Sequence, residues 1–255
     1  MKIAVSGKGG VGKTTISAGL ARYFAEQGFR VYAVDADPDT SLGMVLGIPQ
    51  ELTEGIKPIV DMREVIAEKS GGGGAFFTLN PDVDDLLEQY SVSHGNIVFF
   101  KMGAVKQGGS SCYCRENSVL NALVNSLLLK KEEVVILDMG AGIEHLTRGT
   151  AGGVDIMIVV TEPSRVSVQT ARVVERLAHD LGVNRVRFVG NKVRSEREEN
   201  FIYDSFPREQ VLGIVHFDDA VLDAAMGTEP QEAPEQIQKS IAVIGQRIKR
   251  EVNNN

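Results

Sequence analysis

Gly7-Lys8-Gly9-Gly10-Val11-Gly12-Lys13-Thr14-Thr15 follows a short apolar run at residues 3–5 and precedes a stretch of helical periodicity at residues 13–26. It satisfies the pattern G-x-x-x-x-G-K-[ST] between a predicted strand and a predicted helix, as a phosphate-binding loop requires. The glycines let backbone N–H groups converge on phosphate oxygens, and the helix adds unpaired N–H groups and the positive end of its dipole. We therefore predict that residues 7–15 bind the phosphates of a nucleotide.

Two side chains of this loop have predicted roles of their own. Lys13 is expected to reach the β and γ phosphates, and the Thr14 hydroxyl is expected to ligate Mg²⁺. The backbone of the remaining loop residues completes the predicted phosphate site, at Gly9, Gly10, Val11, Gly12 and Thr15.

Short β-branched runs recur along the 255-residue chain, and most are separated by segments long enough for a helix. These runs lie at residues 3–5, 31–34, 97–100, 134–137, 156–160, 186–189 and 211–215. Because parallel strands need crossover connections, the alternation predicts an α/β doubly wound, mainly parallel sheet of about seven strands flanked by helices. Two helices have clear ends, at residues 13–26 before Gly28 and at residues 164–181 before Gly182. We expect one P-loop NTPase domain over residues 1–255.

Two regions outside this alternation have their own patterns. Residues 51–109 are less regular and contain four consecutive glycines at residues 71–74, which predicts a flexible loop that is either a mobile lid or partner contact or a plain surface insertion. Four isoleucines near the C-terminus share one helical face, which predicts a helix packed on the domain: Ile237, Ile241, Ile244 and Ile248. A membrane-surface helix is the alternative, although no Trp or Phe supports it.

The composition argues against two classes of partner. A net charge of −7 and a pI near 5.2 give no overall attraction to nucleic-acid phosphates or anionic lipids. No run of 18 apolar residues occurs, and Met1 and Lys2 lead directly into the first apolar run. We expect a cytoplasmic protein without nucleic-acid or membrane partners.

The loop contains an additional lysine, Lys8, and with it resembles the deviant P-loop of the MinD, ParA and nitrogenase iron protein superfamily. The resemblance implies an Mg²⁺-dependent ATPase that binds ATP and ADP and forms a face-to-face dimer. In that dimer Lys8 would contact the phosphates bound by the partner subunit, as an arginine finger does elsewhere. The resemblance also implies that Asp37, which precedes Pro38, positions the attacking water, and that Asp35 supports the Mg²⁺ shell.

Two later strand ends fit the same resemblance. The apolar run at residues 134–137 ends in Asp138, the Walker B pattern, which implies that Asp138 holds Mg²⁺ through water. The residues 140–142 that follow would form switch II, which moves when the γ phosphate is lost. Asn191 matches the adenine-contacting asparagine of the family, with a second adenine contact at residues 215–218; an ordinary turn residue is the alternative for Asn191.

Cys112 and Cys114 are the two cysteines of the chain. They are too few for a disulfide scaffold, and two thiolates in a loop can bind one soft metal ion but leave a four-coordinate ion half satisfied. A symmetric dimer would supply the missing ligands if the pair lay near its two-fold axis, because an isologous contact repeats each ligand. A helix-like segment at residues 118–129 follows the pair, and two incidental cysteines remain the alternative.

The cysteine loop at residues 108–116 and the stretch at residues 138–150 together resemble the CooC proteins, the accessory ATPases of carbon monoxide dehydrogenase. The resemblance spans essentially the whole chain. It implies ATP-dependent maturation of the Ni–Fe–S active site of carbon monoxide dehydrogenase by a homodimer that shares Ni²⁺ between its subunits, with Cys112 and Cys114 as ligands. Zn²⁺, Cu⁺ or an iron–sulfur cluster could occupy the same four thiolates.

Three other functions remain open from the sequence. An iron–sulfur reductase would need a cluster that bridges the dimer, and a MinD- or ParA-like positioning ATPase would need a membrane or DNA surface. A small-molecule kinase would need an acceptor site that the sequence does not reveal. The four histidines have no spacing that would place two zinc ligands on one helical face.

Overall fold

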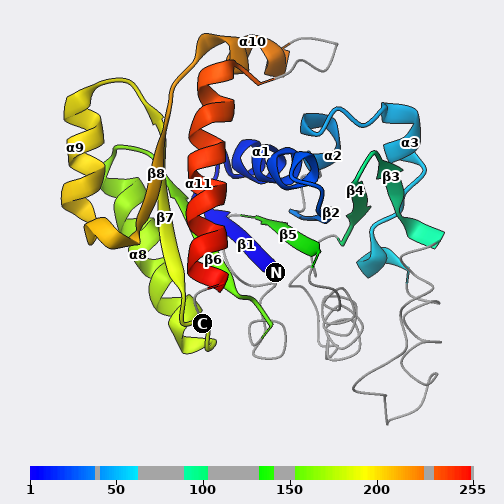
Figure 1. Ribbon diagram of the computed structural model, residues 1–255, viewed down its shortest axis with the longest axis horizontal. Coiled ribbons are helices and arrows are strands. Elements are labelled where there is room, and N and C mark those ends of the chain that lie inside the picture. The colour runs from blue at the N-terminus through cyan, green and yellow to red at the C-terminus, as the bar shows by residue number, and fades with distance from the viewer. Residues whose placement is uncertain (38–40, 63–88, 103–131, 141–152, 227–232, 254–255) are drawn as a thin grey trace.

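The computed structural model describes residues 1–37, 41–62, 89–102, 132–140, 153–226 and 233–253. Eight strands in these residues form one sheet in the order β3-β4-β2-β5-β1-β6-β7-β8 (Figure 1). Their bounds are β1 Lys2–Gly7, β2 Arg30–Ala36, β3 Val92–His94, β4 Ile97–Lys101, β5 Glu133–Met139, β6 Ile156–Thr161, β7 Val186–Val193 and β8 Val211–His216.

Each of the seven predicted strands is present, and every pairing among them is parallel. The doubly wound sheet is therefore confirmed. An eighth strand, β3, was not predicted; it pairs antiparallel with β4 across the two-residue turn Gly95-Asn96. Gly95 has a φ of 59°, a conformation that glycine adopts without strain in tight hairpins.

Residues 51–109 are more regular than predicted where the structure describes them. Short helices α2 (Leu42–Val45) and α3 (Gln50–Glu54) lie before and at the start of this segment, a 3₁₀ turn covers Ile59–Asp61, and β3 and β4 lie near its end. The prediction of a loop was wrong for α3, the 3₁₀ turn and β3, whereas β4 is the strand predicted at residues 97–100. The glycine run at residues 71–74 lies outside the described residues.

Helices cover both faces of the sheet. The first face carries α1 (Lys13–Glu26), α2 and α11 (Glu235–Asn253), and the second carries α8 (Arg165–Asp180) and α9 (Glu196–Ser205). Two further elements follow α9, a 3₁₀ turn at Arg208–Gln210 and α10 (Asp219–Met226). The predicted ends of α1 and α8 are confirmed, because Gly28 and Gly182 follow them with positive φ.

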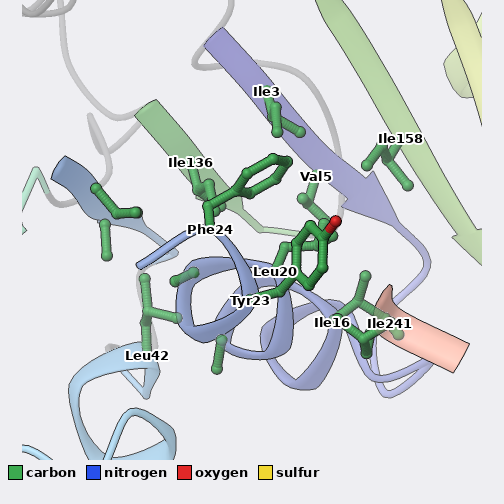
Figure 2. Close-up of a cluster of buried hydrophobic side chains, with 14 of the residues drawn as sticks. Ile3, Val5, Ile16, Leu20, Tyr23, Phe24, Leu42, Ile136, Ile158 and Ile241 are labelled. Carbon is green, nitrogen blue, oxygen red and sulfur yellow. The ribbon is translucent and has the colours of Figure 1, made fainter. Parts of the chain in front are cut away.

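The core has two layers because successive strand residues point to opposite faces. On β1, Ile3 and Val5 pack in the cluster beneath α1 and α11, whereas Ala4 belongs to the cluster beneath α8 and α9. Figure 2 shows the first cluster, where the α1 side chains Ile16, Leu20 and Phe24 lie among residues of the strands, α2 and α11.

The helix predicted from four isoleucines is α11, and all four side chains are buried. Ile241 lies against Gly19 of α1, and α11 runs between α1 and β8 (Figure 1). Packing on the domain is thus confirmed over the membrane-surface alternative. The contact with α1 is close: a Cβ at Gly245 would lie 2.3 Å from the Tyr23 ring atom Cε1 and 2.4 Å from Cδ1.

Replacing Gly245 by alanine should lower the free energy of unfolding. Helix propensity alone would favour alanine inside α11 by about 1 kcal/mol. However, the added methyl group would overlap the ring of Tyr23, which is buried, and overpacking of this kind typically costs about 1–3 kcal/mol. We therefore expect Gly245→Ala to lower Tm in differential scanning calorimetry.

The matched control is the same substitution in a Tyr23→Leu background. Without the ring, alanine at position 245 should be neutral or stabilising, because only its helix propensity remains. A stabilised Gly245→Ala single variant would contradict the close packing of α11 on α1.

Candidate nucleotide and magnesium site

The predicted site residues meet at one edge of the sheet. Because β1, β2, β5, β6 and β7 are parallel, their carboxyl ends lie along the same edge. The phosphate loop, residues 8–12, leaves β1 between its neighbours β5 and β6. Ligands of doubly wound sheets bind outside the carboxyl ends of the strands at such a central position.

The backbone requires glycine at both ends of this loop, at Gly7, the last residue of β1, and at Gly12. Gly7 has a φ of 148°, and a Cβ there would lie 2.3 Å from the Val160 carbonyl oxygen of β6. Gly12 has a φ of 90°, and a Cβ there would lie 2.3 Å from Nδ2 of Asn191. The loop therefore lies against the backbone of β6 at Gly7 and against the Asn191 side chain of β7 at Gly12, and a side chain at either position would clash.

The first turn of α1 is left open to a ligand. Gly12 is the N-cap residue, no side chain caps the helix, and the first turn holds no acidic residue. In contrast, Ser164 caps α8 and Ser195 caps α9 through hydrogen bonds to backbone N–H groups. The N–H groups of the first turn, which no side chain caps, and the dipole of α1 favour an anion at this end.

The loop side chains lie at different depths. Lys13 is 7% exposed, and its Nζ lies 3.4 Å from the carbonyl oxygen of Lys8. Lys8 itself is exposed, whereas Thr14 and Thr15 are half-buried. The Thr14 hydroxyl is 3.4 Å from Oγ of Ser41, at the start of α2. Thus Lys13 lies inside the loop, while Lys8 faces solvent.

Asp138 has an oxygen that is suited to a cation. The residue is 1% exposed at the end of β5, and its Oδ1 accepts a 2.8 Å hydrogen bond from the Ser17 hydroxyl of α1. Its Oδ2 is buried and has no hydrogen-bond partner among the described residues. Burial raises the pKa of Asp138 to about 6, and the hydrogen bond from Ser17 opposes that shift. A carboxylate oxygen without a partner, near the Thr14 hydroxyl, fits the oxygen ligands that Mg²⁺ prefers.

Asp35 is the direct neighbour of Asp138 in the parallel register of β2 and β5. It is fully buried, and burial raises its pKa to about 7. Its Oδ1 accepts from the N–H of Asp37 at 3.2 Å, and its Oδ2 accepts from the N–H of Leu42 at 3.0 Å. Asp35 therefore accepts hydrogen bonds from both ends of the segment that leads from β2 to α2. A role for Asp35 in the Mg²⁺ shell stays a prediction.

Asp37 lies at the start of that segment and is half-buried. Its N–H donates to Oδ1 of Asp35, and its negative charge contributes to raising the pKa of both Asp35 and Asp138. Its role in positioning water stays a prediction, and residues 38–40 lie outside the described residues.

Asn191 is 6% exposed near the end of β7 and contacts the phosphate loop directly. Its Nδ2 donates a 2.7 Å hydrogen bond to the carbonyl oxygen of Val11. This bond places the side chain at the loop, and a contact of Asn191 with adenine stays a prediction. The loop at residues 215–218 is adjacent, because the N–H of Phe217 donates to the Val193 carbonyl at 2.9 Å, and the Arg194 guanidinium lies 4.2 Å from the centre of the Phe217 ring.

Three residues at or beside the site were not predicted: Ser17, Lys192 and Glu162. Ser17 lies one helical turn after Thr14 on α1, and this spacing could have indicated that the two share a face. Lys192 donates from Nζ to the Gly10 carbonyl, and its Nζ lies 3.7 Å from Oε1 of Glu162. No local pattern predicts that pair, because its members come from different strand ends.

Cys112, Cys114, the helix-like residues 118–129 and residues 141–142 of the predicted switch II lie outside the described residues. Within the described part of the chain, no group of three or more His, Cys, Asp or Glu side chains is arranged to hold a metal ion. No helix in the same residues is long and apolar enough to cross a membrane.

Known proteins share this sequence and fold. Residues 2–230 match the CobQ/CobB/MinD/ParA nucleotide binding domain. The carbon monoxide dehydrogenase accessory protein CooC of Rhodospirillum rubrum is 43% identical over 87% of this chain and 85% of its own length. An ATP-binding protein of Methanocaldococcus jannaschii is 39% identical over 96% of both chains. Among solved structures, the septum site-determining protein MinD of Pyrococcus horikoshii, complexed with Mg-ADP, superimposes with a TM-score of 0.68 over 98% of this chain and 96% of its own, at 21% identity.

Replacing Asp138 by asparagine should stabilise the protein in the absence of nucleotide and metal while abolishing Mg²⁺-dependent ATP hydrolysis. The raised pKa means that the folded state disfavours the ionised carboxylate, at an upper-limit cost on the order of 2–3 kcal/mol. This cost is absent below the ordinary pKa near 4, grows as the pH rises through the folded pKa of about 6, and is constant above it. Chemical denaturation should therefore show a stability gain for Asp138→Asn that is largest above pH 7 and disappears toward pH 4.

Asp204→Asn, at an exposed site on α9, is the control and should change neither stability nor hydrolysis. An Asp138→Asn variant no more stable than the wild type at pH 8 would show that the buried carboxylate carries no penalty.

Proposed function

The chain belongs to the CobQ/CobB/MinD/ParA family of nucleotide-binding domains, and within that family we propose that it is a cytoplasmic ATPase that delivers nickel to the Ni–Fe–S active site of carbon monoxide dehydrogenase. The observation that carries the proposal is the 43% identity, over most of both chains, to a carbon monoxide dehydrogenase accessory protein. The only two cysteines of the chain, spaced to bind one soft metal ion, support it independently.

The geometry of the strand ends supports the ATPase part of the proposal. The uncapped N–H groups of α1 and the buried ammonium of Lys13 would bind the β and γ phosphates. Thr14 and Asp138 would hold Mg²⁺, directly or through water, and the ion would neutralise charge that develops on the phosphate oxygens. Asp37 would orient the attacking water, and Asn191 and residues 215–218 would contact the adenine.

Lys8 would complete the site of a second subunit. Its side chain is exposed although it belongs to the same loop as the buried Lys13. An exposed lysine can reach phosphates across a dimer interface, where it would stabilise the transition state as an arginine finger does. ATP would thereby favour a face-to-face homodimer.

The same dimer would complete the nickel site. Cys112 and Cys114 of each subunit would meet near the two-fold axis and offer four thiolates to one Ni²⁺ ion, which is cargo for the dehydrogenase. Zn²⁺ would compete for these ligands because it also prefers sulfur. Hydrolysis would reset the segment after β2 and the segment after β5, and the change in subunit geometry would alter how tightly the thiolates hold the ion. Linkage then requires that metal also favours dimerisation.

A positioning ATPase like MinD is the second candidate, because the fold likeness to MinD extends over nearly the whole chain. It would bind a surface in an ATP-dependent way without needing metal. The net charge of −7 gives such a surface no electrostatic attraction if it is DNA or anionic lipid.

Loss of the Lys8 side chain should abolish hydrolysis but leave nucleotide binding intact. We expect Lys8→Ala to lower kcat by at least about 100-fold, because a cation supplied in trans contributes to the transition state rather than to ground-state binding. The affinity for Mg-ADP, measured by titration calorimetry, should stay within about threefold of the wild type. Lys57→Ala, at another exposed lysine, should change neither quantity.

Mixing inactive variants tests whether Lys8 acts across the interface. Equal amounts of Lys8→Ala and Lys13→Ala subunits should recover up to about a quarter of wild-type activity, since half of the dimers are mixed and each holds one complete site. If the mixture is as inactive as each variant alone, Lys8 does not act in trans.

The metal site is tested by anaerobic size-exclusion chromatography of reduced protein with metal quantification. Wild type with Ni²⁺ and Mg-ATP should shift from monomer to dimer and bind about one ion per two chains. The Cys112→Ser/Cys114→Ser variant should bind no ion and lose the metal-dependent part of the shift. Parallel samples with Zn²⁺ report on competition.

Each alternative function has its own result in this experiment. Dimers that form with ATP but ignore metal and both serine substitutions would favour the positioning ATPase. A visible absorption band with iron in anaerobically purified protein would favour the iron–sulfur reductase.

A further inference from the structure

Lys192 has a backbone conformation that lysine rarely adopts. Its φ is 58°, and it is the one non-glycine residue with positive φ in the described part of the chain. The register of β7 against β8 shifts between Gly190 and Val193, so the strand is also irregular at this point. A left-handed conformation costs a residue with a Cβ of order 1 kcal/mol, which glycine would avoid. Such strain persists where the surrounding structure enforces it, and it often marks functional positions.

The strained residue directs its side chain to the phosphate loop. The Lys192 ammonium donates a hydrogen bond to the carbonyl oxygen of Gly10. The preceding residue, Asn191, donates from Nδ2 to the carbonyl oxygen of Val11 at 2.7 Å. Two consecutive residues of β7 therefore fasten two consecutive carbonyl groups of the phosphate loop.

Glu162 holds the ammonium in place from the end of β6. Its Oε1 lies 3.7 Å from Nζ of Lys192, and its own N–H donates to Oγ of Ser167 in α8 at 3.0 Å. The two side chains are 42% and 36% exposed, so the ion pair by itself is weak. Its effect is to orient the lysine rather than to stabilise the fold.

Fixing a carbonyl group fixes the N–H group of the same peptide unit, because the two point in opposite directions across a planar trans peptide. The carbonyl groups of Gly10 and Val11 are held on the β7 side, so the N–H groups of Val11 and Gly12 point away from β7. Among the described residues, the N–H of Val11 makes only a long contact of 3.5 Å, to the carbonyl of Lys8. Gly10 has a φ of 81°, and no described atom outside its chain neighbours lies within 4 Å of an added Cβ, so the described residues do not enforce its conformation by packing.

We propose that Lys192 is a positioning residue of the nucleotide site, which holds the Gly10 carbonyl so that the phosphate loop is ordered before the phosphates of the nucleotide bind. A glycine-rich loop that orders only on binding loses affinity through conformational entropy, and an anchored carbonyl reduces that loss. The proposal rests on the nucleotide-binding part of the function proposed above and is independent of nickel and of the two cysteines.

Three substitutions separate the ammonium group from the backbone strain. Lys192→Met retains the strain and the side-chain stem but removes the ammonium; Lys192→Gly removes both, and Lys192→Arg keeps a positive charge and a donor. We expect the Kd for Mg-ADP, measured without nickel, to rise about 5- to 10-fold in the Met and Gly variants, the net contribution of one ordinary hydrogen bond. The Arg variant should stay within about twofold of the wild type.

The glycine variant also distinguishes positioning from a structural role. Because glycine relieves the left-handed conformation, its Tm should equal or exceed that of the wild type while its nucleotide affinity falls. In steady-state kinetics KM for ATP should rise with kcat within about twofold, since the contact acts on binding rather than on the transition state. Hydrogen exchange of the Val11 and Gly12 amides should be faster in the Met variant than in the wild type.

Two outcomes would overturn the proposal. Wild-type affinity in both the Met and the Gly variants would show that the ammonium does not position the loop. Weaker binding in the Gly variant alone would assign the effect to backbone freedom at position 192. Binding of Mg-ADP by the wild type is the reference for every comparison, so its absence would refute the nucleotide site itself and not only the role of Lys192.

Discussion

The parallel pairing of β1 with β5 on one side and β6 on the other is the constraint on which the site depends. It places the start of the phosphate loop in the middle of the sheet, where strand ends from both halves of the chain converge. The Val160 carbonyl of β6 comes so close to Gly7 that only glycine fits, and Asn191 of β7 approaches Gly12 in the same way. The shape of the loop is thus set by neighbouring strands as much as by its own sequence.

The second feature of the site is the burial of negative charge. Asp35 and Asp138 are neighbours in the β2–β5 register, both are almost inaccessible, and burial raises the pKa of each. Carboxylates placed in this way oppose folding at neutral pH unless cations or donors compensate them. Asp35 is compensated by two backbone N–H groups, whereas Asp138 has one hydroxyl donor and an oxygen without a partner among the described residues. The same burial that disfavours the ionised carboxylates would therefore favour the binding of a cation beside them.

Local sequence patterns predicted the parts of the molecule that local forces determine. Seven buried strands, the ends of α1 and α8 and the buried face of α11 followed from hydrophobic periodicity and glycine positions. The three-residue β3 was too short for a pattern, although the Gly95-Asn96 turn was a usable signal. Ser17 and Lys192 act through contacts with residues 121 and 182 positions away in the sequence, which no local pattern contains. Asn191 was identified by resemblance for an adenine contact, and its hydrogen bond to Val11 depends on how β7 and the loop pack.

The long sequence separations in the sheet also determine when this protein can fold. Lys2 pairs with Val135 and Ile3 with Ile156, so β1 finds its neighbours only after 133 and 153 further residues have been made. Ile241, which packs against Gly19 of α1, is synthesised later still. Topologies dominated by such distant contacts fold slowly and expose apolar surface in the meantime. The apolar side chains of α1 that are buried in the folded protein, among them Ile16, Leu20 and Phe24, therefore stay without their α11 partner until late in translation.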